Sequence, residues 1–300
     1  MTWIVELPLA TYPVNLRADL AGDGRYSFDT AGALMWLSQL AYESDENIDT
    51  ILQRWQLVRA APLHSPPEGF AAARGFVAAG WGGTIVALAG TDPLVPKNWL
   101  TDFDVLKVND VLGGFEKAVA SIAQPLQDAV DQRDPGVRPL YFTGHSMGGA
   151  LAAVAAKQLK NPSDVTAVYT FGMPRCGGDR FNKEYAALQD RTYRLVHGDD
   201  IVATVPPSEL FFHHVGRLLS CRHGGSFDPA MQPEATPSDE PTLAPTVLAG
   251  FRDVLGYMMD FALPAAAQPG ILGQAFRFLP PAIGDHVPSQ YLQALGFQLR

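Results

Sequence analysis

The chemistry of this chain centres on a serine in the run Gly144-His145-Ser146-Met147-Gly148-Gly149. An apolar stretch, 140–143, precedes the run, and the small residues 150–156 that follow it are typical of a buried helix. Glycines two positions before and after a serine permit a sharp strand-to-helix turn, because a Cβ there would clash where strand and helix approach. The first turn of the helix then directs N–H groups at the reaction centre. The pattern predicts a nucleophilic serine, Ser146, for acyl transfer.

A nucleophilic serine needs a base, and the base needs a carboxylate that orients it. In chains with such a serine elbow the acid follows the serine and the histidine comes last. Asp199 and Asp200 come just after an apolar run. We favour Asp200 as the acid because Ile201 and Val202 anchor its backbone, whereas Asp199 can face solvent. The alternative interpretation of this pair is an ordinary turn.

Seven histidines compete for the role of base. We favour His286, because it lies in the loop 284–288 before the last predicted helix and can reach Ser146 from there. The alternative is a loop histidine that faces solvent beside Asp285. The other histidines fit less well, because they precede the acid, lie inside the elbow, start a predicted strand or open a linker: His64, His145, His197, His213, His214 and His223. We expect His145 to pack under the turn.

Acyl transfer also needs donors for the developing oxyanion. One is expected to be the backbone N–H of Met147, directly after the nucleophile. The second should come from a loop after an earlier strand, and Gly90-Thr91-Asp92 follows the apolar run 85–89. Thr91 could donate both its N–H and its hydroxyl. A plain strand-ending turn is the alternative.

The elements around these residues alternate between strand and helix patterns. Asp29 is expected to cap a helix that runs to Ala41, and Pro125 to kink or interrupt a helix with a buried face over 115–130. The remaining expected elements are a hairpin of 75–80 and 84–89, strands at 140–143, 167–171 and 192–196, a polar helix at 179–188, a loop or linker at 228–245, apolar helix-like stretches at 246–263 and 271–283, and a last helix at 288–297. This order predicts an α/β fold with parallel strands and crossover helices on both faces of the sheet.

Composition narrows the function classes. Three hundred residues that are 47% hydrophobic can bury one large α/β core, and a net charge of −9 disfavours nucleic acid and anionic membranes as partners. Cys176 and Cys221 are too few for a disulfide framework or a zinc site, and the sequence leaves open whether they pair. No signal-peptide pattern, membrane-span length, P-loop or dinucleotide fingerprint is visible. We therefore expect a cytoplasmic protein, or one exported without a cleavable signal.

The chain resembles the class 3 lipases, the family that includes the fungal triacylglycerol lipases. The stretches that carry the resemblance are 89–92, 98–102, the elbow, 170–175, 200–202 with 206–207, 214–216, 285–286 and 291–292, in the family's order. The resemblance implies an α/β-hydrolase fold with a mostly parallel sheet, a triad of Ser146, Asp200 and His286, and Thr91 as oxyanion residue. It also implies a lid near 93–100 that carries Trp99 and Leu100.

Two departures from that family stand out. The run 111–115 lacks a histidine that the family often has there, at a position outside the triad. The stretch 222–283 between acid and base is longer than in the compact fungal lipases. Within a single domain, 1–300, we interpret 222–283 as an insertion that is either extra core or a cap over the site.

These features predict a lipase or carboxylesterase that hydrolyses acylglycerol esters through an acyl-enzyme, with no metal or organic cofactor and with its lipid substrate at an oil–water interface. A phospholipase A1 or an esterase for soluble esters is the enzyme alternative, because elbow and triad do not encode the leaving group. A catalytically silent lipid-binding protein is the alternative from another class. The oligomeric state stays open.

Overall fold

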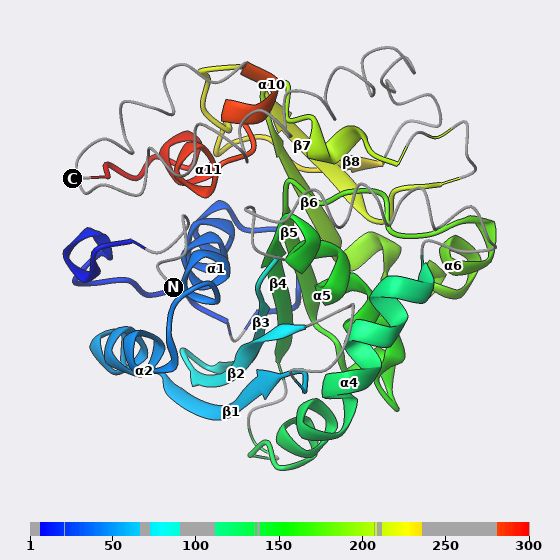
Figure 1. The fold of residues 1–300 in the computed structure, drawn as a ribbon. Coiled ribbons are helices and arrows are strands. Elements are labelled where there is room, and N and C mark those ends of the chain that lie inside the picture. Colours follow the sequence, from blue (N-terminus) through cyan, green and yellow to red (C-terminus); the bar gives the residue numbers. More distant parts are fainter. Residues whose placement is uncertain are drawn as a thin grey trace.

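An eight-stranded sheet organises the described residues, and its strand order follows the chain from β1 to β8 (Figure 1). The structure is a computed structural model, and it describes residues 7–20, 22–66, 73–90, 112–134, 136, 139–206, 208, 212–235 and 281–299. The strands are β1 (Val58–His64), β2 (Arg74–Gly80), β3 (Gly83–Leu88), β4 (Leu140–His145), β5 (Ala167–Phe171), β6 (Thr192–His197), β7 (Arg217–Cys221) and β8 (Glu234–Ala235).

The five strands from β3 to β7 are parallel, and antiparallel pairs close both edges. The predicted hairpin is confirmed as β2 and β3, and Trp81 and Gly82 turn between them with φ of 53° and 84°. The edge strands β1 and β8 were not predicted. β1 lacks an apolar run because most of its side chains are exposed or half-buried, and β8 has only two residues.

Helices cover both faces of the sheet, as expected. Figure 1 shows α1 and α11 on one side and α4, α5 and α6 on the other. The helices are α1 (Phe28–Leu40), α2 (Asp45–Arg54), α4 (Leu112–Asp131), α5 (Met147–Gln158), α6 (Asp179–Glu184), α10 (Pro281–Gly284) and α11 (Pro288–Ala294). Short 3₁₀ turns are η1 (Leu9–Thr11), η2 (Pro162–Asp164), η3 (Ala186–Arg191) and η4 (Val202–Thr204).

The helices lie on both faces as expected, but the expectation that the crossover helices are divided between the two faces is wrong. From β3 to β7 the strand order never reverses, and crossovers between parallel strands are right-handed. The connecting helices α4, α5 and α6 therefore all lie on one face, where they share a hydrophobic cluster. Helices from before and after the parallel strands, α1 and α11, fill the opposite face and share the other cluster. The last helix, α11, is thus part of the core, and the loop directly before it holds the predicted base.

The core is two layers with the sheet between them. Along β3, Ile85 and Ala87 face the α1 side, whereas Val86 and Leu88 face the α4 side, as the pleat of a strand requires. α1 is buried from Thr30 to Gln39 and beyond, because it lies between the sheet and the surrounding chain. A helix that is buried on all sides has no polar face, so its sequence lacks an amphipathic pattern.

Three local predictions need correction. The cap of α1 is Ser27, whose side chain accepts from the Thr30 N–H, and Asp29 lies inside the first turn. α4 continues through Pro125, because this residue and Ser121, whose carbonyl it leaves unpaired in the helix, are both exposed to water. The helix predicted at 179–188 is divided into α6 and η3.

Several predictions fall on residues outside the described part of the chain. These are the apolar helix at 246–263, most of the stretch 271–283, and the lid near 93–100. Within the described residues, the helices are too short or too polar to cross a membrane. Cys176 is buried and Cys221 half-buried, and neither forms a disulfide.

Candidate functional site

Ser146 occupies a strained turn between β4 and α5. Its φ of 60° and ψ of −134° lie outside the regions that most side chains adopt. The neighbouring glycines make the turn possible: a Cβ on Gly148 would lie 2.2 Å from the Leu88 carbonyl oxygen, and a Cβ on Gly144 would lie 2.2 Å from the Gly148 oxygen. The Ser146 N–H donates to the Phe171 carbonyl at 2.8 Å. The turn thus presents the Ser146 hydroxyl where the parallel strands end.

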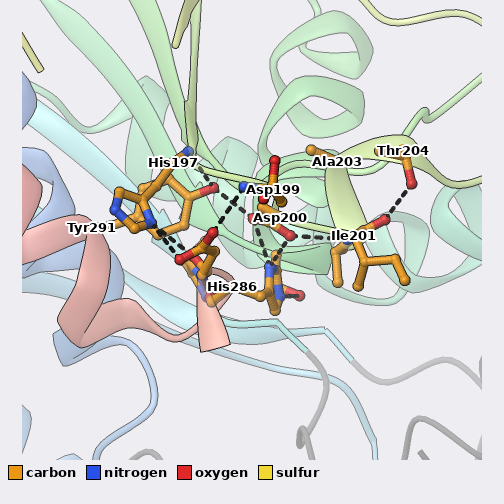
Figure 2. A network of polar contacts seen from close by, with 12 residues as sticks. His197, Asp199, Asp200, Ile201, Ala203, Thr204, His286 and Tyr291 are labelled. Carbon is orange, nitrogen blue, oxygen red and sulfur yellow. Dashed lines mark hydrogen bonds and ion pairs between the residues drawn. The ribbon is translucent and has the colours of Figure 1, made fainter. Parts of the chain in front are cut away.

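His286 joins Ser146 to Asp200 through two hydrogen bonds. Its Nε2 lies 2.9 Å from the Ser146 Oγ, and its Nδ1 lies 2.9 Å from each carboxylate oxygen of Asp200. Since a carboxylate only accepts, Nδ1 carries the proton and Nε2 is left to accept the serine proton. The Asp200 carboxylate is buried, whereas the His286 side chain, which Figure 2 shows beside it, is 16% exposed. The structure therefore brings together the three residues that the sequence singled out.

Two further donors hold the Asp200 carboxylate. The Tyr291 hydroxyl, labelled in Figure 2, donates to its Oδ2 at 2.5 Å. The Val202 N–H donates to its Oδ1 at 2.9 Å. Burial, with the charge of Asp200, raises the pKa of Tyr291 well above its usual range, so the hydroxyl keeps its proton. Sequence reasoning missed this role of Tyr291. Only the family resemblance, which includes 291–292, singles out this residue, because nothing in the local sequence pattern indicates that it contacts a carboxylate.

Gly172 leaves room for this arrangement at the end of β5. It has a φ of +60°, and a Cβ there would lie 2.6 Å from the Asp200 Oδ2 and 3.0 Å from both the His286 Nδ1 and the Tyr291 Oη. No other residue type fits this position without displacing the three groups. In the sequence, the run 170–175 stands out only through the family resemblance.

His145 packs under the turn, as expected, and it also holds the backbone of His286. It is 2% exposed; its Nε2 donates to the His286 carbonyl at 2.7 Å, and its Nδ1 accepts from the Tyr42 hydroxyl at 3.1 Å. Burial, and then the nearby His286, lowers the pKa of His145 well below its usual range. A neutral imidazole with one donor and one acceptor nitrogen fits both contacts.

The other histidines take structural positions. His64 lies beside Asp45 and His213 beside Asp179 at the surface, whereas the buried His214 donates from Nε2 to the Ala203 carbonyl at 2.8 Å. The pKa of His214 is lowered by burial. His197 and His223 lie near the Asp285 carboxylate. None of these side chains contacts Ser146 in the described structure.

The proposed oxyanion donors are only partly within the described residues. Met147 is the first residue of α5, so its N–H lies at the helix N-terminus beside Ser146. The end of β3 approaches the same place: a Cβ on Gly90 would lie 3.3 Å from the Ser146 Cβ. Thr91 follows Gly90 in the chain but lies outside the described residues, as do Trp99 and Leu100.

Comparison with known families agrees with this geometry. Residues 85–210 match the model of the family Lipase (class 3). A secreted mono- and diacylglycerol lipase of Fusarium solani is 34% identical over 127 residues, which cover 39% of this chain and 38% of that protein. The chain spans less than half the length of the curated relatives it matches.

Solved structures share the fold. A mono- and diacylglycerol lipase from Aspergillus oryzae matches with a TM-score of 0.54 at 17% identity, over 68% of this chain and 83% of that one. A triacylglycerol lipase whose catalytic centre is a serine protease triad matches with a TM-score of 0.53 at 21% identity, over 64% of this chain and 79% of that one. At these identities the likeness shows the α/β-hydrolase fold.

Proposed function

We propose that this chain, which belongs to the class 3 lipase family through residues 85–210, is a serine esterase that hydrolyses the carboxylic ester bonds of acylglycerols. The observation that carries the proposal is the hydrogen-bonded series from the Ser146 hydroxyl through His286 to the buried Asp200 carboxylate. Its order is the one that acyl transfer needs: a nucleophile, a base within reach of its proton, and an acid that orients the base.

In the first half of the reaction, the Ser146 Oγ attacks the ester carbonyl carbon while the His286 Nε2 takes its proton. Asp200 stabilises the imidazolium that results and keeps its Nδ1–H directed at the carboxylate. The carbonyl oxygen becomes an oxyanion. We propose that the N–H groups of Met147 and Thr91 and the Thr91 hydroxyl donate hydrogen bonds to it. The imidazolium then protonates the leaving alcohol, the ester C–O bond breaks, and the acyl group stays on Ser146.

In the second half, water replaces the alcohol. His286 takes a proton from the water as its oxygen attacks the acyl carbon, and it returns that proton to the Ser146 Oγ as the acyl-enzyme bond breaks. The products are a fatty acid and the regenerated hydroxyl. The fixed contacts of Tyr291, Val202 and His145 support this cycle, because they hold the acid and the base in place between its steps.

The substrate class rests on the relatives. The Fusarium protein and the Aspergillus structure are both described as mono- and diacylglycerol lipases, which supports partial glycerides as substrates. We further propose that the chain meets these substrates at an oil–water interface. The word secreted in the Fusarium protein's name supports export of this chain. We also propose that residues 1–300 form one domain in which 222–283 is an insertion or a cap.

Two measurements on the purified chain test the proposal. A fluorophosphonate probe should label the wild type at Ser146 and leave the Ser146→Ala variant unlabelled. A turnover panel should then compare emulsified mono-, di- and triacylglycerols with phospholipid and with soluble p-nitrophenyl esters. Faster turnover of phospholipid would instead indicate a phospholipase A1. Labelling and turnover that are both absent from the wild type would indicate a catalytically silent lipid-binding protein.

A further inference from the structure

A second buried carboxylate, that of Asp285, lies directly before His286 in the chain. It is 2% exposed, so its charge requires partners that replace water. The Asp199 N–H donates to its Oδ2 at 2.8 Å. The Nδ1 of His223 lies 2.8 Å and 2.9 Å from its two oxygens, and the Nδ1 of His197 lies 3.4 Å from its Oδ1. Two separate parts of the chain, the end of β6 with the loop after it and the turn after β7, therefore converge on this one side chain.

The contact between Asp285 and Asp199 runs beside the contact between His286 and Asp200. In each case a residue of the loop before α11 is bonded to a residue of the loop after β6. The two hydrogen bonds thus join the same two loops, one residue apart. His286 cannot move away from Asp200 as part of its loop unless the bond to Asp199 also breaks.

The backbone of the loop after β6 leaves space for the Asp285 carboxylate at Gly198. Gly198 has a φ of +56°, and a Cβ there would lie 2.0 Å from the Asp285 Oδ2. Any other residue at 198 would therefore occupy the space of the carboxylate. This close approach indicates that the Asp285 side chain has one fixed position, since a mobile surface carboxylate would not need a glycine beside it.

His223 covers the carboxylate from outside. It lies in the turn after β7, and its side chain is 56% exposed, whereas the Asp285 side chain is 2% exposed. Because the carboxylate only accepts, the His223 Nδ1 carries the proton of this hydrogen bond. His223 thereby ties a third segment, the start of the connection 222–283, to the loop that carries the base.

We propose that Asp285 and His223 are a positioning pair that holds His286 at Asp200, a role that rests on the proposed esterase function. Asp285 acts through the placement of the imidazole and does not touch the ester. A misplacement of about 1 Å at a catalytic group can lower the rate by about 10²-fold. Loss of the pair should therefore lower kcat while substrate binding, and with it KM, stays unchanged.

The test compares four variants with the wild type, using a soluble p-nitrophenyl ester. We expect Asp285→Ala to lower kcat by about 10- to 100-fold with little change in KM. Asp285→Asn retains an acceptor for the Asp199 N–H and should recover part of that loss. His223→Ala should lower kcat by several-fold. His213→Ala is the matched control, because His213 is also an exposed histidine 2.8 Å from a carboxylate, and it should keep wild-type kcat.

A double-mutant comparison separates positioning from a structural role. In the His286→Ala background there is no imidazole to place, so adding Asp285→Ala should leave the residual rate unchanged. An equal further loss there would overturn the proposal, because it would indicate damage to the elbow itself. Wild-type kcat in Asp285→Asn and His223→Ala would also overturn it, and these two variants decide the matter if Asp285→Ala does not fold.

An NMR measurement distinguishes failure of this inference from failure of the proposed function. The downfield Nδ1–H resonance of His286, assigned by its absence in His286→Ala, reports the bond to Asp200 without any turnover. If the wild type shows the resonance but hydrolyses no ester, the esterase proposal fails. If Asp285→Ala and His223→Ala keep the resonance as sharp as in the wild type, the positioning pair is refuted.

Discussion

Gly172→Ala tests how tightly the site is packed around Asp200. The added Cβ would lie 2.6 Å from the Asp200 Oδ2, whereas a carbon and an oxygen without a bond stay more than about 3 Å apart. The carboxylate must therefore move by several tenths of an ångström, and the His286 Nδ1 and Tyr291 Oη, each 3.0 Å from the Cβ, must shift with it. The φ of +60° adds about 1–2 kcal/mol of backbone strain for alanine.

These displacements act on the catalytic geometry more than on substrate binding. We expect kcat for a soluble p-nitrophenyl ester to fall by about 10- to 100-fold, with KM nearly unchanged. The free energy of unfolding, measured by urea titration, should fall by about 1–3 kcal/mol.

Gly296→Ala is the matched control for this change. Gly296 also has a positive φ, +89°, but a Cβ there would meet nothing within 4 Å. It should show the strain in its unfolding free energy and still keep wild-type kcat. If Gly172→Ala keeps wild-type kcat, or if both variants lose kcat alike, close packing around Asp200 does not govern turnover and the reasoning is refuted.

Three other changes have defined outcomes. Ser146→Ala should keep the melting temperature and lower hydrolysis by about 10⁶-fold, and measurable turnover at Ser146→Ala would assign the nucleophile elsewhere. Tyr291→Phe removes the donor to Asp200 and leaves the buried His197 N–H without its 3.1 Å acceptor, so the unfolding free energy should fall by about 1–3 kcal/mol in a urea titration; an unchanged value would contradict this contact. Asp285, through its hydrogen bond and its charge, and then Asp199 raise the pKa of His223 above its usual range. Because the folded-state pKa of His223 is raised, its ion pair with Asp285 stabilises the folded state fully below the unfolded-state pKa of about 6.5. This stabilisation is lost as the pH rises through the folded-state pKa. Urea midpoints at pH 6 and pH 9 should therefore differ more in the wild type than in His223→Gln, and equal differences would show that the ion pair adds nothing.

The sequence by itself determined what depends on neighbours in the chain. The elbow at Ser146 is visible because its glycines, the strand before it and the helix after it are contiguous. The expected order along the chain, serine first, then acid, then histidine, led from there to Asp200 and His286. The β2–β3 hairpin and the central strands were predictable for the same reason, since short apolar runs and turn residues act locally. The cap of α1 was misplaced from Ser27 to Asp29, because two adjacent residue types can serve and only the backbone geometry decides.

The tertiary structure decided how those residues are held. Tyr291, Asp285 and His223 act on partners 62 to 91 residues away, and no local pattern encodes such contacts. The need for glycine at 172 and 198 is likewise a matter of which side chains arrive there from elsewhere. The side of the sheet that each helix covers follows from a strand order that never reverses, and that order exists only once the strands have paired. The residues to which we assign the reaction were therefore visible in the sequence, whereas their positioning depends on distant segments that meet only in the folded chain.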